Sequence, residues 1–502
     1  MSASVLSVSL VDLDVHPYED FQGIDSSRDE AAQDTGSKQS LVKCENAYCD
    51  WRGAITVEPG STKRETSSDG VISHIEFYGR DLACWSQLDG GGVTLWSDAE
   101  HEANEVYPVN TAVTSAVFNH KALFTAKGEP MYAYDGVKWE EVEQRSGAQP
   151  AYMVACQRRL FTARMVGNET QILATRVDTY DVFPDDEADD ETSVLKAADI
   201  EIGNIIGTAD GIKGLGVLEK NRLAVFTNDV TLIYKVHPDY TGWTLEDKAN
   251  INVGTISHNT IQQVGTDLYF CARDGVHSLK RSDANGVTIY SVPMSEKITE
   301  IYRGLLQRVS NHEMIEANYS QDHRQYNIYF PVTDSVSYRL TLSLNPVRGQ
   351  DHKWSTGSFL NARCESSLGG VTLLGTPGGV YKKHMIEEEA AHYPIAEIVT
   401  PVLWHGKINE NKSTNSLIVQ AAGSGVVTIR AVDDTNRDMA TLSFEITEDS
   451  VDDSFMDVPL SQQYTRKFEH QYLGVQFYIT LAPTGPGPMR ITGFAVGVKK
   501  ED

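Results

Sequence analysis

The sequence lacks the cysteine density of a protein held together by disulfides. Its 502 residues contain six cysteines, and only Cys44 and Cys49 are close together. No CxxC motif or pair of histidines completes a zinc set around these two. A chain of this length can bury enough core without disulfides. We therefore expect buried free thiols at all six positions: Cys44, Cys49, Cys84, Cys156, Cys271 and Cys364.

Basic residues are also scarce. The chain has 43 Lys and Arg against 70 Asp and Glu, which gives a formal net charge of −27 and a pI near 4.9. Binding to nucleic acid phosphates requires Lys and Arg to replace counterions, so this composition argues against a general nucleic-acid binder. The negative charge has two possible roles: it maintains solubility, or it forms a surface that repels a polyanion.

Long apolar runs are missing as well. No stretch approaches the roughly 18 apolar residues of a membrane span, so we expect no membrane-spanning segment. The first residues, MSASVLSVSLVDLDVHPYED, have no basic region followed by an apolar run, so we expect no secretory signal. Hydrophobic residues make up 40% and charged residues 23%, which is typical of a folded chain, and the length predicts two or more domains.

Motifs for nucleotide or nucleophile chemistry are absent. The sequence has neither a G-x-S-x-G elbow nor a G-x-x-x-x-G-K-[ST] loop. NHEMIE (311–316) is not HExxH, because Glu316 stands where the second histidine is needed; an HExxE set could coordinate a metal, but this one lies outside the helical pattern of 295–306. The acidic run within 181–204, which includes the carboxylates of 185–191, lacks the order of an EF-hand loop; a solvated loop is expected, and a calcium site is the alternative. A sialidase would repeat the hairpin YDGVKW, which occurs once.

The stretch VGTISHNTIQQVGTDLYFCARDGVHSLK (253–280) combines residues that suggest catalysis: His258, Cys271, Asp274 and His277. Cys271 falls in an apolar strand, where a thiol is usually inert. Asp274 stands before Gly275, where a hairpin turn favours it. We therefore expect these residues to shape a hairpin, and we predict no catalytic, cofactor-binding or metal-binding residues and no enzyme activity.

A short apolar strand recurs from residue 70 onward, usually followed by a turn and a second strand. Gly136, Gly254 and Gly275 are expected to hold turns. Trp139, Phe226, Tyr269 and Phe330 are expected to fill the space between units. The recurring strands are LACW (82–85), LFTA (123–126), LFTA (160–163), LAVF (223–226), LYFC (268–271), YNIYF (326–330) and VTLLG (371–375).

Sheets this small cannot bury both faces alone, but radial stacking buries each face against a neighbour. The copies are irregular, averaging about 48 residues, near the period of propeller repeats. The sequence thus predicts a mainly β chain with few helices: a β-propeller of six or seven irregular blades over 66–392. Two packed sandwiches are the alternative. SEKITEIYRGLL (295–306) has helical spacing, with Ser295 as the N-cap.

The two ends of the chain differ from this middle region. Residues 1–65 are polar with weak periodicity and form a predicted extended N-terminal segment. Residues 393–502 alternate strongly, as in GVVTIRAV and LGVQFYITL, which predicts a C-terminal β-sandwich domain.

The segment 221–280 resembles the central blades of tail nozzle proteins of short-tailed bacteriophages, also called tail tubular or packaged-DNA stabilisation proteins. Their pattern of "vfT", "gt", "vyf" and "dGv" is matched by Phe226-Thr227, Gly254-Thr255, Leu268-Tyr269-Phe270 and Asp274-Gly275-Val276. LVKCENAYCDWRGAITVEPGSTKR (41–64) is similar to the family's opening, although Glu58 stands where Arg is common.

The resemblance implies a structural virion protein, assembled in the host cytoplasm, that forms a homo-hexameric ring at the end of a phage tail. Its implied partners are a portal-adaptor protein and tail fibre or needle proteins, and residues 1–65 are expected to contact the adaptor or neighbouring subunits. Double-stranded DNA would pass through the ring without sequence-specific binding, and no cofactor is implied. The alternatives are a β-propeller binding scaffold of another system and a propeller enzyme acting on glycans.

Overall fold

The computed structural model describes most of the chain and divides it into two units. The large unit comprises Thr62–Leu340 and Ser358–Lys383, and the small unit comprises Met1–Ser61, Thr341–Gly357 and His384–Asp502. The residues described are 14–18, 20–27, 40–50, 53–66, 69–79, 82–89, 91–99, 102–143, 150–164, 169–184, 193–206, 211–246, 252–279, 293–344, 352–384, 390–405, 410–446, 462–485 and 489–500. The predicted acidic loop 185–191 lies outside them.

The large unit consists of small antiparallel sheets that follow one another along the chain. The first three sheets contain four strands each, and neighbouring strands in each sheet follow one another along the chain. They are β6 (Val71–Phe77), β7 (Ala83–Asp89), β8 (Gly92–Ser97) and β9 (Glu102–Tyr107); then β10 (Val113–Phe118), β11 (Lys121–Ala126), β12 (Tyr132–Tyr134) and β13 (Trp139–Glu141); then β14 (Pro150–Cys156), β15 (Arg159–Arg164), β16 (Gln171–Ala174) and β17 (Ala198–Glu201).

The next four sheets follow the same plan. The fourth has β18 (Gly214–Leu218), β19 (Arg222–Phe226), β20 (Thr231–Lys235) and β21 (Thr244–Leu245), and the fifth has β22 (Gln262–Val264), β23 (Asp267–Cys271) and β24 (Val276–Ser278). The sixth begins with β25 (Glu316–Ser320), β26 (Gln325–Thr333) and β27 (Val336–Ser343). The seventh has β29 (Cys364–Leu368), β30 (Val371–Thr376), β31 (Gly379–Lys383) and, as its fourth strand, β5 (Ser61–Lys63).

The seven recurring apolar segments of the sequence form the second strand of these seven sheets, namely β7, β11, β15, β19, β23, β26 and β30. A second strand has hydrogen-bonded neighbours on both sides, and its residues are largely buried, as in β11 and β19. Burial on both faces requires a continuous apolar run. This explains why the second strand gave the clearest repeat in the sequence.

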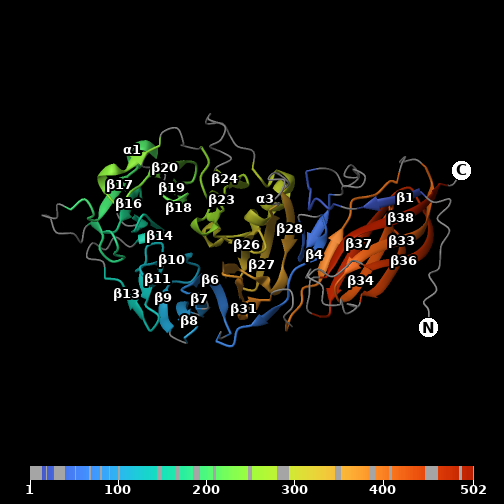
Figure 1. Cartoon of the computed structure of the whole chain (residues 1–502), viewed down its shortest axis with the longest axis horizontal. Coiled ribbons are helices and arrows are strands. Elements are labelled where there is room, and N and C mark those ends of the chain that lie inside the picture. The colour runs from blue at the N-terminus through green and yellow to red at the C-terminus, as the bar shows by residue number, and fades with distance from the viewer. Residues whose placement is uncertain are drawn as a thin grey trace, which may run out of the picture. The chain divides into compact units, whose positions relative to one another are not determined.

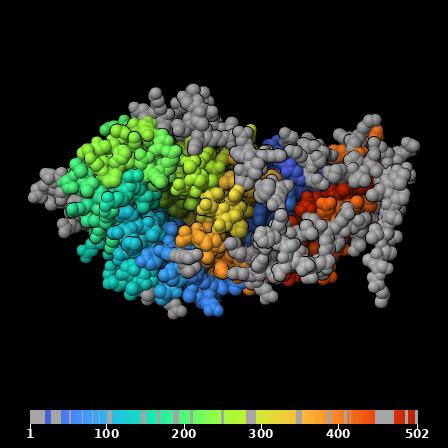
Figure 2. Space-filling model, in the orientation of Figure 1, coloured from blue at the N-terminus to red at the C-terminus, as the bar shows by residue number. Residues whose placement is uncertain are grey.

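Successive sheets of the large unit pack face to face through apolar clusters. Phe226 of the fourth sheet contacts Phe270 of the fifth, with ring centroids 4.9 Å apart. Tyr269 of the fifth sheet contacts Tyr326 of the sixth at 5.8 Å. One cluster also joins the seventh sheet, through Leu373, to the first, through Trp85. The first strands touch in the order β6, β10, β14, β18, β22, β25, β29 and again β6. Figure 1 shows the sheets of this unit succeeding one another from blue through green to orange, and Figure 2 shows the same colours following one another over its surface.

Helices are few among the described residues. The predicted helix 295–306 is present, but it begins with a 3-10 turn, η6 (Glu296–Ile298), and continues as α3 (Thr299–Arg308). Ser295 occupies the N-cap position without capping; its hydroxyl accepts from the Val276 amide at 3.0 Å. The other helical segments are α1 (Gly203–Ile206), η3 (Tyr240–Gly242), η5 (His258–Thr260), η7 (His312–Met314) and η8 (Phe359–Asn361).

The small unit contains two sheets whose buried faces meet, because Phe477 of one contacts Phe494 of the other at 5.4 Å. The predicted alternation is clear in β37, where buried and half-buried residues alternate. One sheet has β3 (Ala47–Cys49), β4 (Ile55–Val57), β38 (Arg490–Lys500), β33 (Lys412–Ala422) and β36 (Gln462–Tyr472), with β1 (Asp14–Tyr18) beside β38. The other includes β28 (Lys353–Gly357), β2 (Lys43–Glu45), β32 (Ala396–Val399), β37 (Val475–Pro483), β34 (Gly425–Asp433) and β35 (Asp438–Ile446).

The prediction of a mainly β chain with few helices is confirmed. The chain passes from one unit to the other at Ser61/Thr62, Leu340/Thr341, Gly357/Ser358 and Lys383/His384, whereas the sequence predicted boundaries at 65/66 and 392/393. The first 61 residues belong with the C-terminal strands, because β1 and β4 both pair with β38. Among the described residues, no helix is long and apolar enough to cross a membrane.

Candidate functional site

The candidate site is a cavity of about 450 Å³ in the large unit, lined by residues from the first strand of every one of its seven sheets. We call it the axial pocket. A polar residue stands at alternate positions of several of these strands, as with Glu316 and Asn318 on β25. Side chains two apart on a strand point the same way. The axial pocket therefore collects polar groups from sheets that are far apart in the sequence.

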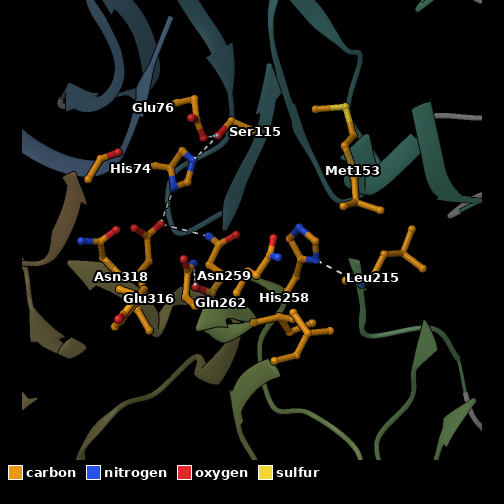
Figure 3. Close-up of a pocket in the computed structure, with 18 of the residues that line it drawn as sticks. His74, Glu76, Ser115, Met153, Leu215, His258, Asn259, Gln262, Glu316 and Asn318 are labelled. Carbon is orange, nitrogen blue, oxygen red and sulfur yellow. Dashed lines mark hydrogen bonds and ion pairs between the residues drawn. The ribbon is translucent and has the colours of Figure 1, made fainter. Parts of the chain in front are cut away.

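His74 is the centre of the polar contacts in the pocket (Figure 3). Its Nδ1 lies 2.7 Å from Glu316 Oε1, and its Nε2 lies 2.7 Å from the Ser115 hydroxyl. Ser115 donates in turn to Glu76 Oε2 at 2.8 Å. Asn259 also donates to Glu316 Oε1, at 2.9 Å, and to the Val113 carbonyl at 2.7 Å. These bonds connect the first, second and sixth sheets with η5.

Burial and charge shift the pKa values of these groups in different directions. Burial lowers the pKa of His74, but the charge and hydrogen bond of Glu316 outweigh it, so the net shift is upward. Burial raises the pKa of Glu76. Burial and the nearby charge of His74 lower the pKa of His258 to about 3. The neutral His258 ring accepts from the Leu215 amide at its Nδ1, 3.2 Å away.

A second network surrounds Glu365, on the seventh sheet. Its carboxylate accepts hydrogen bonds from the Tyr329 hydroxyl and from the amides of Asn318 and Asn327. Burial raises the pKa of Glu365, but the charge of Lys383 and the hydrogen bond from the Tyr329 hydroxyl lower it by more, so the net shift is downward. This carboxylate is therefore ionised and ties the sixth sheet to the seventh.

The chemistry available in the pocket is limited by these bonds. Both ring nitrogens of His74 and the Nδ1 of His258 are engaged, and the Glu76, Glu316 and Glu365 carboxylates bond to groups from other elements. In the part of the chain that the structure describes, no group of three or more His, Cys, Asp or Glu residues is arranged to hold a metal ion. The arrangement holds sheets together.

The residues of the 253–280 stretch are not brought together as one site. His258 lines the axial pocket, whereas Cys271 lies buried on β23, where burial raises its pKa to about 12. Asp274 and His277 form a local pair within the hairpin, with Asp274 Oδ1 2.9 Å from His277 Nε2. His277 also stacks on Phe270. The structure thus places Asp274 and His277 within one hairpin and Cys271 in its buried strand. All six cysteines are free and buried, as predicted.

The two ends of NHEMIE separate. His312 lies in η7, with its Nε2 3.1 Å from the Leu306 carbonyl oxygen. Glu316 begins β25 and pairs with His74 in the axial pocket. Glu313, between them, pairs with Lys213 at 2.8 Å. The motif therefore contains one pocket residue, Glu316, but its partner His74 lies 242 residues earlier in the chain.

The predicted turn glycines have different roles. Gly136 adopts a φ of +95° in the turn between β12 and β13, as expected. Gly254 allows close backbone packing, because a Cβ there would lie 2.2 Å from the Thr227 carbonyl oxygen. A Cβ at Gly275 would lie 2.5 Å from Ser295 Oγ. Close approach thus explains the last two glycines.

The predicted aromatic residues are only partly as expected. Phe226 is buried between the fourth and fifth sheets, and Tyr269, half-buried, contacts the sixth sheet. Trp139 is half-buried in the cluster of the first two sheets. Phe330 differs, because its ring contacts Tyr302 of α3 at 6.0 Å. A helix covers this position, which the strand pattern alone did not indicate.

Sequence reasoning missed His74, Glu76, Ser115, Asn259 and Glu365. The signal was present as polar residues at alternate positions just before the recurring apolar strand: HIE (74–76), EAN (316–318) and ESS (365–367). In a solvent-facing strand the same alternation is ordinary, so it becomes informative only once these strands are known to share one pocket.

Comparisons with known proteins identify no family for the chain. No protein-family model matches it, and no curated protein matches it. Among solved structures, the extracellular domain of a hybrid two-component system protein from Bacteroides thetaiotaomicron is similar, with 9% identity and a TM-score of 0.40, over 88% of this chain and 62% of that one. This chain thus spans less than two thirds of that neighbour.

Two further solved structures are similar at lower scores. BamB from Moraxella catarrhalis has 10% identity and a TM-score of 0.32, over 66% of this chain and 100% of that one. The enzymatically active domain of bacteriophage CBA120 tailspike protein 4 has 10% identity and a TM-score of 0.16, over 34% of this chain and 18% of that one. At these scores no similarity supports a conclusion about function.

Proposed function

We propose that the large unit is a seven-bladed β-propeller and that the small unit is a β-sandwich. The support for a closed ring is that each sheet packs on the next and that the seventh also packs on the first. Gly375 of β30 illustrates this last contact, because a Cβ there would lie 2.8 Å from a side-chain carbon of Ile72 on β6. Thr62 and Lys63, from the start of the unit, complete the sheet that ends it. Pairing the two ends in one sheet leaves few exposed edges.

We propose further that the protein is a structural subunit of the tail nozzle of a short-tailed bacteriophage and has no enzymatic activity. The observation that carries this proposal is the use of the polar groups in the axial pocket. His74, Glu316 and Glu365 are occupied by bonds between sheets. An enzyme instead needs a base or nucleophile within reach of its substrate. The resemblance of residues 221–280 and 41–64 then selects the nozzle family among scaffolds.

The charge is consistent with a conduit for DNA. A net charge of −27 on each chain would be multiplied in a hexameric ring. One carboxylate–phosphate pair about 10 Å apart is worth only about 0.4 kcal/mol in water, and salt reduces this further. The expected effect of the negative charge is therefore that the ring does not bind the DNA, so the genome can slide through it. The expected partners are an adaptor above the ring and fibre or needle proteins beside it, and the expected location is the virion.

Electron microscopy of the purified protein, alone and with its adaptor, tests the assembly. We expect rings with six-fold symmetry and, by fluorescence anisotropy, no binding of duplex DNA at physiological salt. A chain that stays monomeric with its adaptor, or that binds duplex DNA tightly under these conditions, would contradict the nozzle. A monomer that instead captures another protein would favour the binding scaffold.

A propeller enzyme acting on glycans is the second candidate, because Glu76 and Glu316 line the same cavity and glycosidases use paired carboxylates. Turnover of polysaccharides by the wild-type protein and by Glu316→Gln decides this point. Turnover that Glu316→Gln abolishes, while the variant keeps its fold, would replace the structural proposal with the enzymatic one. Equal, background turnover by both proteins supports the scaffold.

A further inference from the structure

The three bonds around His74 require a specific number of protons. Nδ1 faces a Glu316 carboxylate oxygen, which only accepts. Nε2 faces the Ser115 hydroxyl, whose single proton is donated to Glu76. With Glu76 ionised, Nε2 must therefore donate to Ser115 as well. Both ring nitrogens carry a proton in this arrangement, so His74 is an imidazolium.

We propose that His74, in its protonated form, staples the first, second and sixth sheets together across the axial pocket, and that loss of this proton loosens the three sheets. A neutral imidazole carries one proton fewer than the network needs. Either the contact with Glu316 loses its hydrogen, or Nε2 takes the Ser115 proton and Glu76 loses its donor. A buried acceptor without a donor is costly, so one of the links weakens.

The charges that face His74 act in the same direction. Glu76 comes from its own strand and Glu316 from β25, while Ser115 of β10 is neutral and His258 of η5 is uncharged near neutral pH. The charge of Glu316 also reaches the start of the seventh sheet, where it acts to raise the pKa values of Arg363 and Cys364. When His74 is neutral, two buried carboxylates face each other without the cation between them, and their repulsion is expected to grow.

The pH dependence follows from the direction of the pKa shift. Folding raises the pKa of His74 above the ordinary value of 6.5. The stabilisation is therefore complete below 6.5 and is lost as the pH rises through the folded pKa. The equilibrium constant for opening of the three sheets should increase by about tenfold for each pH unit that separates the folded pKa of His74 from 6.5. This inference concerns the large unit alone and does not depend on the nozzle assignment.

A double-mutant cycle measured at two pH values tests the staple. The proteins are the wild type, His74→Gln, Glu316→Gln and the double variant. Hydrogen exchange of the β6 and β25 amides, corrected for intrinsic rates, gives the opening equilibrium at pH 6 and pH 9. We expect a coupling of tenfold or more between the two positions at pH 6, falling close to onefold at pH 9. His120→Asn is the control, because His120 is exposed in a turn where its φ is +59°, which Asn tolerates.

Packing alone would give the same coupling at both pH values, and that result would overturn the proposal. So would a pH dependence that His120→Asn abolishes and His74→Gln retains. If the pocket variants do not fold, the wild-type protein still decides the matter. An NMR titration in which His74 loses its proton above 6.5, together with faster exchange of β25 over the same range, supports the staple. Titration of His74 at or below 6.5 refutes it.

Discussion

Replacing Phe226 with Ala tests the packing of neighbouring sheets most directly. Phe226 is fully buried on β19, in a cluster that includes Ile233 and Leu268, and its ring lies 4.9 Å from that of Phe270 on the next sheet. An aromatic side chain buries about 150–250 Å², which at about 25 cal/mol per Å² corresponds to roughly 4–6 kcal/mol. Measured Phe→Ala changes in cores cost about 3–5 kcal/mol, since neighbours relax only in part.

We therefore expect Phe226→Ala to lower the free energy of unfolding of the large unit by about 3–5 kcal/mol. Urea-induced unfolding followed by circular dichroism measures this change, and amide hydrogen exchange of β19 and β23 locates it. Val137→Ala is the matched control, because Val137 is 67% exposed in a hairpin turn and should change stability by less than about 0.5 kcal/mol. A loss below about 1 kcal/mol for Phe226→Ala, with an unchanged denaturant slope, would refute the sheet-to-sheet packing.

Substitutions at three other positions test the polar contacts of the large unit by thermal or urea-induced unfolding. The buried side chain of Asp98 accepts a hydrogen bond from Arg64 Nε at 2.7 Å. Asp98→Asn should lower the free energy of unfolding by about 1.5–3 kcal/mol, because a charge-assisted bond is lost. An unchanged stability would exclude this bond. Arg159 is buried and donates to the backbone carbonyls of Pro238 and two other residues. Arg159→Met should therefore lower the free energy of unfolding by about 2–5 kcal/mol, and Arg159→Lys should not restore the lost stability. Rescue by Lys would show that charge alone suffices. Glu365 has a lowered pKa, so its stabilisation is complete above 4.5 and is lost as the pH falls through the folded pKa. Glu365→Gln should therefore flatten the acid side of the stability profile, and an unchanged profile would contradict the second network.

Much of the fold could be predicted from apolar patterns that are local in the sequence. The segments LFTA and LAVF became the doubly buried second strands of their sheets, because continuous burial leaves a continuous apolar run. The alternation in 475–483 became a strand with one buried face. The helix after Ser295 followed from its spacing, although the residue serves as a partner for Val276 and caps no amide.

Contacts between distant segments could not be predicted in this way. The 341–357 segment belongs to the small unit, where Thr356 of β28 pairs with Glu45 of β2. The sequence of neither short strand indicates its partner, because both contain residues that are common in any half-buried strand. Phe330 likewise matched the pattern of a sheet-to-sheet contact, but it packs on Tyr302 of a helix. Such pairings depend on chain topology, which the period of a single strand does not contain.

The axial pocket raises a question that stability alone does not answer. Buried ion pairs often contribute less to stability than apolar residues of similar volume, because both charges must leave water. His74 and Glu316 stand where apolar side chains would fill the space without that cost. An ion pair gives two properties that apolar packing lacks: it fixes which groups face each other, and it depends on pH. The three directed bonds around His74 provide the first property, and its imidazolium provides the second. Apolar replacement at both positions should therefore keep the fold and abolish the pH dependence, which separates the function of this pair from its contribution to stability.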